Sequence, residues 1–203
     1  MLRLLMTISL VILTTMPLSA AIGAKPRSLS GIGLLTMGAE MTLAKGAPPQ
    51  FPVYKEPNFG RLGEQTANRL PGIAPAMLPV EGEWYAIVTA TRPGWIRIIY
   101  DDAEREGWIP ERKALGFRKW HEYLPGRRIT LLPGIRKDYY LLRDEASLTS
   151  PPRETISRAG LLAVGKVEGD WIHVKSGGKL SGWLRWRDDN GRLVVLLNPQ
   201  IKP

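Results

Sequence analysis

Hydrophobic and polar positions alternate in two short stretches of the chain that resemble each other. The first runs Trp95-Ile96-Arg97-Ile98 and leads, after a polar turn, to Gly107-Trp108-Ile109. The second runs Trp171-Ile172-His173-Val174 and leads, after a polar turn, to Gly182-Trp183-Leu184. Because period-2 alternation predicts half-buried strands, each stretch predicts a Trp-led strand, a hairpin and a second strand that starts with Gly-Trp. The repetition predicts two copies of one small unit that differ in loop length.

A second alignment of the two halves is also possible. Glu81-Gly82-Glu83-Trp84-Tyr85 resembles Glu168-Gly169-Asp170-Trp171-Ile172, which would match Trp84 with Trp171 and Trp95 with Trp183. This alignment leaves Gly107-Trp108 without a counterpart. We therefore prefer the first alignment, which accounts for both Gly-Trp strands.

Strand-forming residues between turn signals mark the other expected elements. Val53-Tyr54-Lys55 predicts an opening strand for the first unit, and Tyr139 to Arg143 predicts the opening strand of the second. Residues 111–123 predict a short helix, because Leu115, Trp120 and Leu124 are spaced as one apolar helix face. The further expected strands cover residues 84–90, 127–132, 161–167 and 192–197.

The N-terminus has the pattern of a secretory signal peptide. Arg3 supplies a positive charge, residues 4–16 are almost entirely apolar or Thr/Ser, and Ser19-Ala20-Ala21 offers small residues for cleavage. The apolar run is shorter than the roughly 20 residues of a membrane-spanning helix. We therefore expect a periplasmic or extracellular protein, cleaved near Ala21, with an uncleaved signal segment as the alternative and the only membrane attachment.

Composition narrows the possible chemistry. The chain has no cysteine and only two histidines, His121 and His173, which excludes disulfides, thiol nucleophiles and Cys- or His-rich metal centres. Most acidic residues, such as Asp101 and Asp188, lie in turns, where a solvated carboxylate is a poor general acid. We therefore predict a protein that is not an enzyme, with no catalytic residue, metal or cofactor. A pair of acids converging from different loops is the remaining enzyme alternative.

Positive charge is concentrated in one part of the chain. The formal net charge is +9, and residues 112–143 contain nine basic residues against two acidic ones. Such a field attracts polyanions, which outside the cytoplasm are lipid headgroups and wall polymers rather than nucleic acid. The alternative is a solvated surface that only aids solubility. The expected basic patch consists of Arg118, Lys119, Arg127, Arg128, Arg136 and Lys137.

The repeated pattern of a Trp-led strand, a variable hairpin and a Gly-Trp-aliphatic strand resembles the bacterial Src-homology-3-like domain. The residues that carry this resemblance are Trp95, Ile96, Ile98, Gly107, Trp108 and Ile109, then Trp171, Ile172, Val174, Gly182, Trp183 and Leu184. The resemblance implies a small barrel, commonly found in tandem, with Gly where a strand bends at a corner. The Gly-Pro turn that usually follows the first strand of the family is missing here.

We therefore predict a mainly β protein with two small Src-homology-3-like barrels in tandem, joined by a short basic linker that contains a short helix. A Gly/Ala/Pro-rich region without periodicity precedes the barrels and predicts a flexible tether, although residues 32–35 and 37–43 could dock on the folded part. The expected boundaries are 1–21 for the signal peptide, 22–52 for the tether, 53–112 for the first barrel, 113–138 for the linker and 139–198 for the second barrel.

Aromatic side chains are the candidate ligand contacts, because they stack against sugars and peptides. Trp95 and Trp171 lead strands and are expected in the core. Trp and Tyr residues that follow a corner Gly, stand between arginines or lie on the opening strands are expected at the surface. The expected ligand-binding residues are Trp108, Trp183, Trp186, Tyr54, Tyr139 and Tyr140.

In the family, such domains bind peptidoglycan cross-bridges, other envelope ligands or partner proteins. The resemblance therefore implies an exported, non-catalytic protein that recognises peptidoglycan, another anionic envelope polymer or a partner peptide. The alternative function is that of a structural or assembly subunit of an envelope protein complex, in which the two barrels dock on each other.

Overall fold

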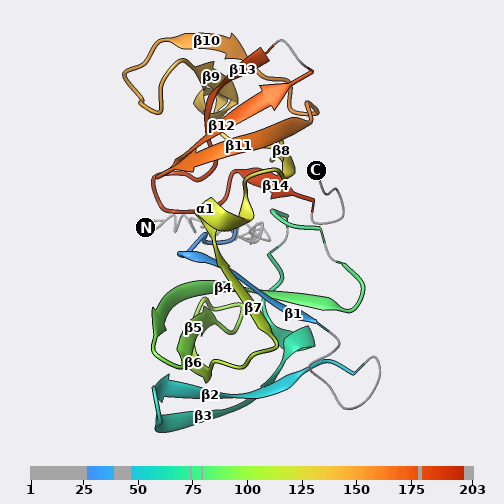
Figure 1. Cartoon of the computed structure of the whole chain (residues 1–203), viewed down its shortest axis with the longest axis vertical. Coiled ribbons are helices and arrows are strands. Elements are labelled where there is room, and N and C mark those ends of the chain that lie inside the picture. Colours follow the sequence, from blue (N-terminus) through green and yellow to red (C-terminus); the bar gives the residue numbers. More distant parts are fainter. Residues whose placement is uncertain (1–26, 39–46, 74, 79, 178–179, 199–203) are drawn as a thin grey trace, which may run out of the picture.

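The computed structural model describes residues 27–38, 47–73, 75–78, 80–177 and 180–198. These residues are mainly β and form two seven-stranded antiparallel sheets, one of which is curled into a half-barrel. The two sheets lie end to end along the long axis of the molecule (Figure 1). No helix in the described ranges is long and apolar enough to cross a membrane. The expected signal peptide, residues 1–21, lies outside the described residues.

The first sheet contains the first seven strands in the order β3-β2-β6-β5-β4-β1-β7. A single turn of 3-10 helix, η2 (Ala67–Arg69), follows β3. The strands are β1 (Gly33–Gly38), β2 (Gln50–Glu56), β3 (Phe59–Thr66), β4 (Glu83–Arg92), β5 (Trp95–Ile99), β6 (Glu106–Pro110) and β7 (Leu115–Lys119).

The second sheet contains the last seven strands in the order β10-β9-β13-β12-β11-β8-β14. The short helix α1 (Trp120–Tyr123) connects the two sheets, and the 3-10 turn η3 (Lys137–Tyr140) precedes β9. The strands are β8 (Arg128–Leu131), β9 (Leu141–Arg143), β10 (Pro152–Thr155), β11 (Leu162–Glu168), β12 (Trp171–Ser176), β13 (Leu180–Arg185) and β14 (Val195–Leu197).

The two sheets have the same topology, because each strand of the first corresponds to the strand seven places later in the chain. Trp95 is the first residue of β5 and Trp171 the first of β12. Across the next hairpin, Trp108 pairs with Arg97 and Trp183 pairs with His173. The alignment that matches Trp95 with Trp171 is therefore confirmed, and the alternative that matches Trp84 with Trp171 is wrong.

Irregularities of the strand pairing are duplicated as well. The β4–β5 ladder shifts between Val88 and Ala90, and the β11–β12 ladder shifts at the matching point, between Val164 and Lys166. The β2–β3 and β9–β10 hairpins also shift at matching positions. Since a bulge redirects the side chains that follow it, the two units share these local changes of direction and not only the order of their strands.

Glycine at the start of each Gly-Trp strand has the same structural role. A Cβ on Gly107 would lie 2.3 Å from the Cγ1 atom of Val53 in β2. A Cβ on Gly182 would lie 2.9 Å from the carbonyl oxygen of Arg143 and 3.3 Å from the Cβ of Leu142 in β9. Only glycine allows the neighbouring strand to approach this closely.

Strand β1 lies inside residues 22–52, for which the sequence predicts a flexible tether. It pairs with β4 on one side and β7 on the other, and Leu34, Leu35 and Met37 are fully buried. Gly33 permits the approach of β7, since a Cβ there would lie 2.3 Å from the carbonyl oxygen of Arg118. A short strand buried on both faces lacks the alternation that identifies a half-buried strand, which explains the error.

The expected linker, residues 113–138, also belongs to the sheets. It contains β7 and β8, and the helix expected over 111–123 is limited to the four residues of α1. Residues 115–119 form an edge strand because β1 offers them a partner, and the sequence alone does not reveal that partner. The strands of the first sheet thus span 33–119, which extends the expected 53–112 at both ends. Those of the second sheet span 128–197 and begin before the expected start at 139 (expected range 139–198).

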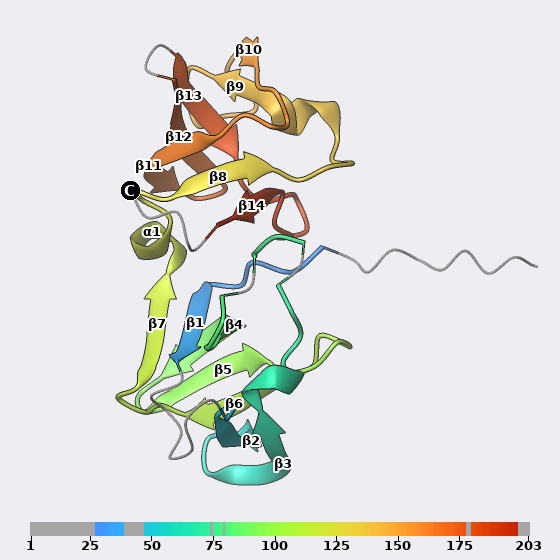
Figure 2. The same ribbon diagram turned by 90° about the vertical axis from the view of Figure 1, so that its right-hand side faces the viewer.

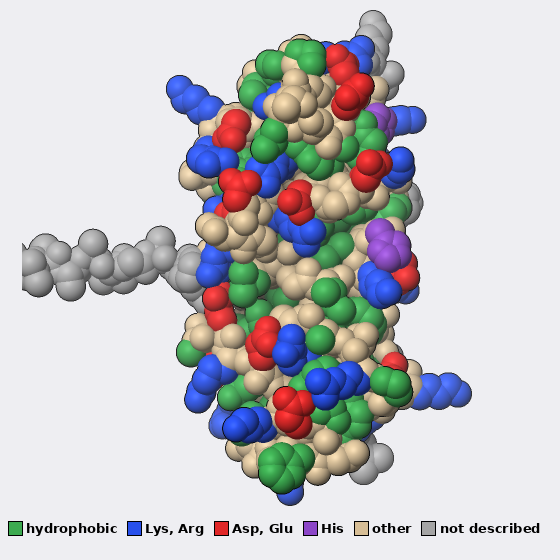
Figure 3. All heavy atoms as spheres, turned by 90° about the vertical axis from the view of Figure 1, so that its left-hand side faces the viewer, with side chains coloured by type: hydrophobic (Ala, Val, Ile, Leu, Met, Phe, Trp, Pro, Cys, Tyr) green, Lys and Arg blue, Asp and Glu red, His purple; other side chains and the backbone are tan. Residues whose placement is uncertain are grey.

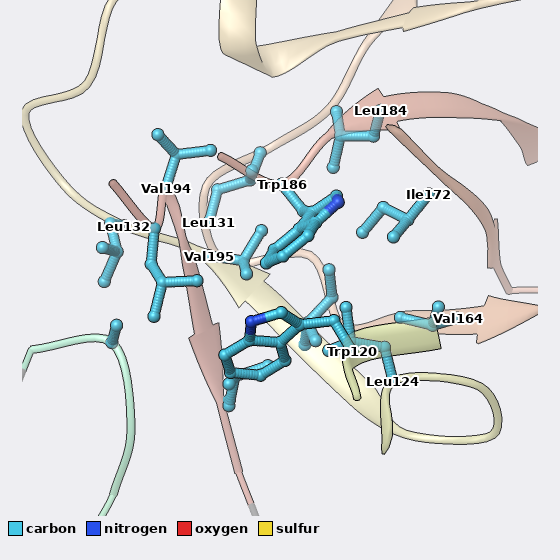
Figure 4. Close-up of a cluster of buried hydrophobic side chains, with 14 of the residues drawn as sticks. Trp120, Leu124, Leu131, Leu132, Val164, Ile172, Leu184, Trp186, Val194 and Val195 are labelled. Carbon is cyan, nitrogen blue, oxygen red and sulfur yellow. The ribbon is translucent and has the colours of Figure 1, made fainter. Parts of the chain in front are cut away.

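Two hydrophobic clusters fill the molecule. One lies within the first unit and includes Leu35, Val53, Ile96 and Ile109. The other fills the second unit and continues into the first, where it includes Leu34, Ile73 and Met77. Trp120 and Trp186 face each other inside this second cluster, with ring centroids 5.3 Å apart (Figure 4). The two units therefore share one continuous core at their junction.

Backbone hydrogen bonds join the units at the same junction. The amide of Ser30 donates to Gly191, and the amide of Leu193 donates to Ser28. The Trp120 indole donates to the carbonyl oxygen of Ser30 at 2.6 Å. Figure 2 shows this N-terminal segment entering between β14 and the first sheet before it continues as β1. The chain's first described residues therefore contact the second unit before they enter the first sheet.

A second connection lies beside it. The amide of Leu197 in β14 donates to the carbonyl oxygen of Ala76, and the amide of Leu78 donates to that of Leu197. Arg192 forms a bidentate ion pair with Glu104 of the first unit at 2.7 and 3.0 Å. The two units consequently form one docked body rather than two domains on a tether.

Candidate ligand-binding surfaces

Three of the six aromatic residues expected at the surface are buried. The exposed fraction is 3% for Trp108, 1% for Trp186 and 3% for Tyr139. Tyr54, Tyr140 and Trp183 are half-buried. These six residues do not form one site, because Tyr54 and Trp108 belong to the first unit and the other four to the second.

Trp186 is part of the core in spite of its arginine neighbours. Its indole donates a 3.0 Å hydrogen bond to the carbonyl oxygen of Gly169, and its ring packs on Trp120. The Arg187 guanidinium covers the ring from outside at 5.0 Å, and Arg185 is itself buried and paired with Asp189 at 2.8 Å. The flanking cations therefore shield a buried indole instead of presenting it to a ligand.

Trp108 points to the outer face of the first sheet and is covered by cations. The guanidinium groups of Arg92 and Arg97 lie 4.8 and 5.6 Å from its ring centre. Arg97 also donates to the hydroxyl of Thr89 at 3.0 Å and pairs with Glu106 at 3.2 Å. Arg92 pairs with Glu56 at 3.0 Å. Cation–π stacking of this kind leaves the indole inaccessible while it holds two ion-paired guanidinium groups at the surface.

Trp95, expected in the core, is half-exposed beside Tyr54. The two rings are 5.3 Å apart and meet edge to face at 88°. Trp95 pairs across the sheet with Pro110 on β6 and with Arg92 on β4. The Tyr54–Trp95 surface, as we define it, consists of two aromatic rings and a proline ring bordered by two arginines: Tyr54, Trp95, Pro110, Arg92 and Arg97.

A signal for this surface was present in the alternation. Trp95 lies on the same strand face as Arg97, while the opposite face carries Ile96 and Ile98, which are buried. Because Ile96 and Ile98 are buried, Trp95 and Arg97 on the other face are half-exposed, whereas Ile99 further along that face is buried. The aromatic character of Trp95 was given more weight than its position, which led to the wrong assignment.

The matching face of the second unit has different residues. The cross-strand partners show that Arg143 occupies the position of Tyr54, and Arg185 that of Pro110. Arg143 donates to the carbonyl oxygen of Ser150, so it is engaged in the loop that follows β9. At the positions that correspond to Tyr54 and Pro110, the second unit therefore has two arginines beside Trp171 instead of an aromatic residue and a proline.

Trp183 is more exposed than its counterpart Trp108. It contacts the His173 ring at 5.4 Å, edge to face, and the Lys166 ammonium lies 5.4 Å from its centre. Lys166 in turn pairs with Glu168 at 3.1 Å. On the second unit, Trp183 is thus half-exposed beside His173 and has one lysine over its ring, whereas Trp108 on the first unit has two arginines.

The six residues of the expected basic patch do not lie together. Arg118 and Lys119 end β7, and Arg127 stacks on Tyr123 at 4.1 Å next to α1. Strand β8 runs away from α1 (Figure 2), and beyond it Arg136 pairs with Asp138 and Asp189. Lys137 follows Arg136, and Arg128 starts β8. On the face in Figure 3, basic, acidic and apolar side chains are interspersed over both units.

A groove that the sequence analysis did not predict lies between the start of β4 and the chain that follows η2. Its volume is about 360 Å³. The described residues that line it are Ala67, Asn68, Leu70, Pro71, Gly72, Ile73, Met77, Leu78, Glu83, Trp84 and Tyr85. We call it the Trp84 groove.

Comparison with known proteins does not place the chain in a family. No family model matches it, and no curated protein matches it either. Among the described residues, no group of three or more His, Asp or Glu side chains is arranged to hold a metal ion.

Proposed function

We propose that this protein is an exported, non-catalytic binding protein built from two Src-homology-3-like barrels, and that its Tyr54–Trp95 surface recognises an anionic envelope polymer such as peptidoglycan. The duplicated strand order, the duplicated bulges and the corner glycines before Trp108 and Trp183 support the barrel assignment. These features show that the repeat seen in the sequence covers all seven strands of each sheet.

The observation that carries the proposal is the half-exposed aromatic pair bordered by cations. Flat rings of Tyr54 and Trp95 offer stacking area for sugar rings or peptide bonds. Arg92 and Arg97 are held beside them by stacking on Trp108, so their positions are fixed before a ligand arrives. Each guanidinium group pairs with one carboxylate of the chain, Arg92 with Glu56 and Arg97 with Glu106, and its remaining N–H groups can donate to a ligand carboxylate. Stacking and charge therefore act on the same surface.

A pulldown with purified peptidoglycan across a salt series tests this proposal. Trp95→Ala should reduce the retained protein at least about tenfold, since exposed Trp residues at interfaces often dominate affinity. The matched control is Trp171→Ala, which changes the corresponding residue of the second unit and should have little effect. Equal loss in both variants, or no retention of the unchanged protein at any salt concentration, would contradict the proposal.

The arginines provide an independent test in the same assay. Arg92→Gln should weaken binding and reduce its dependence on salt, because a charge contact with the polymer is screened by ions. Lys175→Gln, which removes an exposed charge from β12, is the control. A salt dependence that remains unchanged in Arg92→Gln would exclude this surface as the place where the polymer binds.

A role as an assembly subunit is the second candidate, and the β2–β3 hairpin favours it. Phe59 and Leu62 are 72% and 51% exposed, and β3 is an edge strand with no further strand beside it among the described residues. Exposed apolar residues beside a free strand edge suit a partner protein. Loss of a co-purifying protein in Phe59→Ser, with peptidoglycan retention unchanged, would favour assembly over polymer binding.

A further inference from the structure

The Trp84 groove is a preformed hollow at the edge of the junction between the two units. Its volume of about 360 Å³ falls within the range of small-molecule sites, roughly 300–1,000 Å³. The wall formed by residues 70–73, 77 and 78 is held by main-chain hydrogen bonds, from Met77 to Ile73 at 3.0 Å and from Leu78 to Leu197 at 3.2 Å. A ligand would therefore meet a wall that the second unit holds in place.

Most of the groove is apolar. Ile73 and Met77 are buried within the junction core, while Leu70 and Trp84 pack on the core of the first unit. Leu78 remains 42% exposed at the groove, which marks it as a side chain that a ligand can cover. Apolar walls with a few oriented polar groups are typical of sites for small organic ligands.

The polar side chains that line the groove include one carboxylate, and the charge of Arg127, which is outside the lining, acts on Tyr85 from nearby. The hydroxyl of Tyr85 donates to the carboxylate of Glu83. Burial, reinforced by that hydrogen bond, raises the pKa of Tyr85 far above its ordinary value, so this hydroxyl stays neutral. Asn68 contributes a neutral amide. Glu83 is thus the one charged side chain among the described residues that line the groove.

We infer that the Trp84 groove binds a small amphiphilic amine, with its apolar body against Leu78 and Trp84 and its ammonium group at the Glu83 carboxylate. An ammonium carries three donors and no acceptor, which suits a carboxylate that already accepts from Tyr85. The groove shares no residue with the Tyr54–Trp95 surface. The inference therefore goes beyond the proposed binding of an anionic polymer and does not depend on it.

Three probes with the same six-carbon body and different head groups test the inference: hexylamine, hexanol and hexanoate. Binding to the whole chain is followed by NMR chemical-shift changes at neutral pH. We expect hexylamine to bind more tightly than hexanol, and hexanoate to bind least. Glu83→Gln should weaken hexylamine about fivefold and leave hexanol unchanged, the size of effect expected for a partly solvated charge pair.

Two further variants separate the head group from the body. Leu78→Ser should weaken hexylamine and hexanol alike, because it removes apolar contact area from both. Glu81→Gln, two residues from Glu83 and outside the groove lining, is the control and should change nothing. Stronger binding of hexanoate, equal affinity of hexylamine for Glu83→Gln and the unchanged protein, or no binding of any probe would overturn the inference.

Discussion

The two units of this protein have the same strand order and bulge positions, yet their outer faces are different. Inside, Val53 corresponds to Leu142 and Ile109 to Leu184, and all four are buried. Outside, the Tyr54–Trp95–Pro110 group of the first unit corresponds to Arg143, Trp171 and Arg185. Buried positions of the two sheets thus have the same apolar chemistry, whereas the solvent-facing positions differ.

The difference indicates a division of roles between the units. In the second unit, Arg185 and Arg187 are bound by Asp189 and Asp170, and Trp186 belongs to the core shared with the first unit. In the first unit, the corresponding side of β5 and β6 carries half-exposed rings, and its arginines Arg92 and Arg97 pair with Glu56 and Glu106. The half-exposed rings agree with the proposed binding surface on the first unit, and the buried Trp186 gives the second unit a part in the junction core.

Replacement of a core tryptophan gives the largest expected effect. Trp186→Ala should lower the free energy of unfolding by about 3–5 kcal/mol, because it leaves a cavity in the junction core. Trp95→Ala removes a half-exposed ring and should cost less than about 1.5 kcal/mol. Urea unfolding curves measure both. Similar losses in the two variants would contradict the assignment of Trp186 to the core and Trp95 to the surface.

The corner glycines test whether the two units are structurally equivalent. Gly107→Ala and Gly182→Ala should each cost about 1–3 kcal/mol, since the added methyl group overlaps the neighbouring strand. Gly165→Ala is the matched control, because its nearest neighbour would be 3.6 Å from the new Cβ. The midpoint temperature of thermal unfolding should decrease clearly in Gly107→Ala and Gly182→Ala but not in Gly165→Ala. Tolerance of either one would mean that its corner is not closely packed.

Alkaline pH should destabilise the protein through its buried tyrosines. Burial raises the pKa of Tyr123 and of Tyr139. Their contribution to stability is complete below the unfolded-state pKa of about 10 and decreases as the pH rises above it, by about 1.4 kcal/mol per pH unit for each tyrosine that stays protonated. Urea unfolding between pH 9 and 11 measures the slope, which should be shallower in Tyr139→Phe. If the slope is the same in Tyr139→Phe as in the unchanged protein, the raised pKa of Tyr139 is contradicted.

The ion pair between Glu104 and Arg192 gives the smallest expected effect. Hydrogen bonding to Arg192 lowers the pKa of Glu104, so the pair stabilises the fold above the unfolded-state value of about 4.3 and is lost as the pH falls below it. Glu104→Gln should cost about 0.5–1 kcal/mol at pH 7, because the groups are partly solvated. The difference between the two proteins should shrink as the pH falls below that unfolded-state value. A difference that persists there would exclude the ion pair as its cause.

Strands with strict alternation were predictable from the sequence, and strands buried on both faces were not. The paired Trp-led strands β5 and β12 were found from their period, together with the Gly-Trp strands β6 and β13. Strand β1 was missed because its run of Leu34, Leu35 and Met37 has no polar face, and β7 because only its pairing with β1 makes it a strand. These two strands depend on a partner distant in the sequence. The edge strands β3 and β10 were not predicted either, because nearly all of their residues are exposed and no buried face marks them.

The candidate site was only partly predictable for a related reason. Tyr54 was identified as a surface aromatic residue, but Trp95 was assigned to the core, and Trp108 and Trp186 to the surface. Alternation states which residues share a face and does not state which face packs inward. Contacts between strands place Arg92 and Arg97 over the Trp108 ring. Contacts between units form the core around Trp186.

The amino-acid sequence by itself determined the local features of this protein: the duplication, the positions of the hairpins and the glycines at the corners. These follow from near-neighbour periodicity and from steric limits on single residues. The tertiary structure alone decided how the units dock, which tryptophans are buried and where the grooves lie. Those features depend on side chains that are far apart in the chain and meet only when both sheets have folded, so no local pattern encodes them.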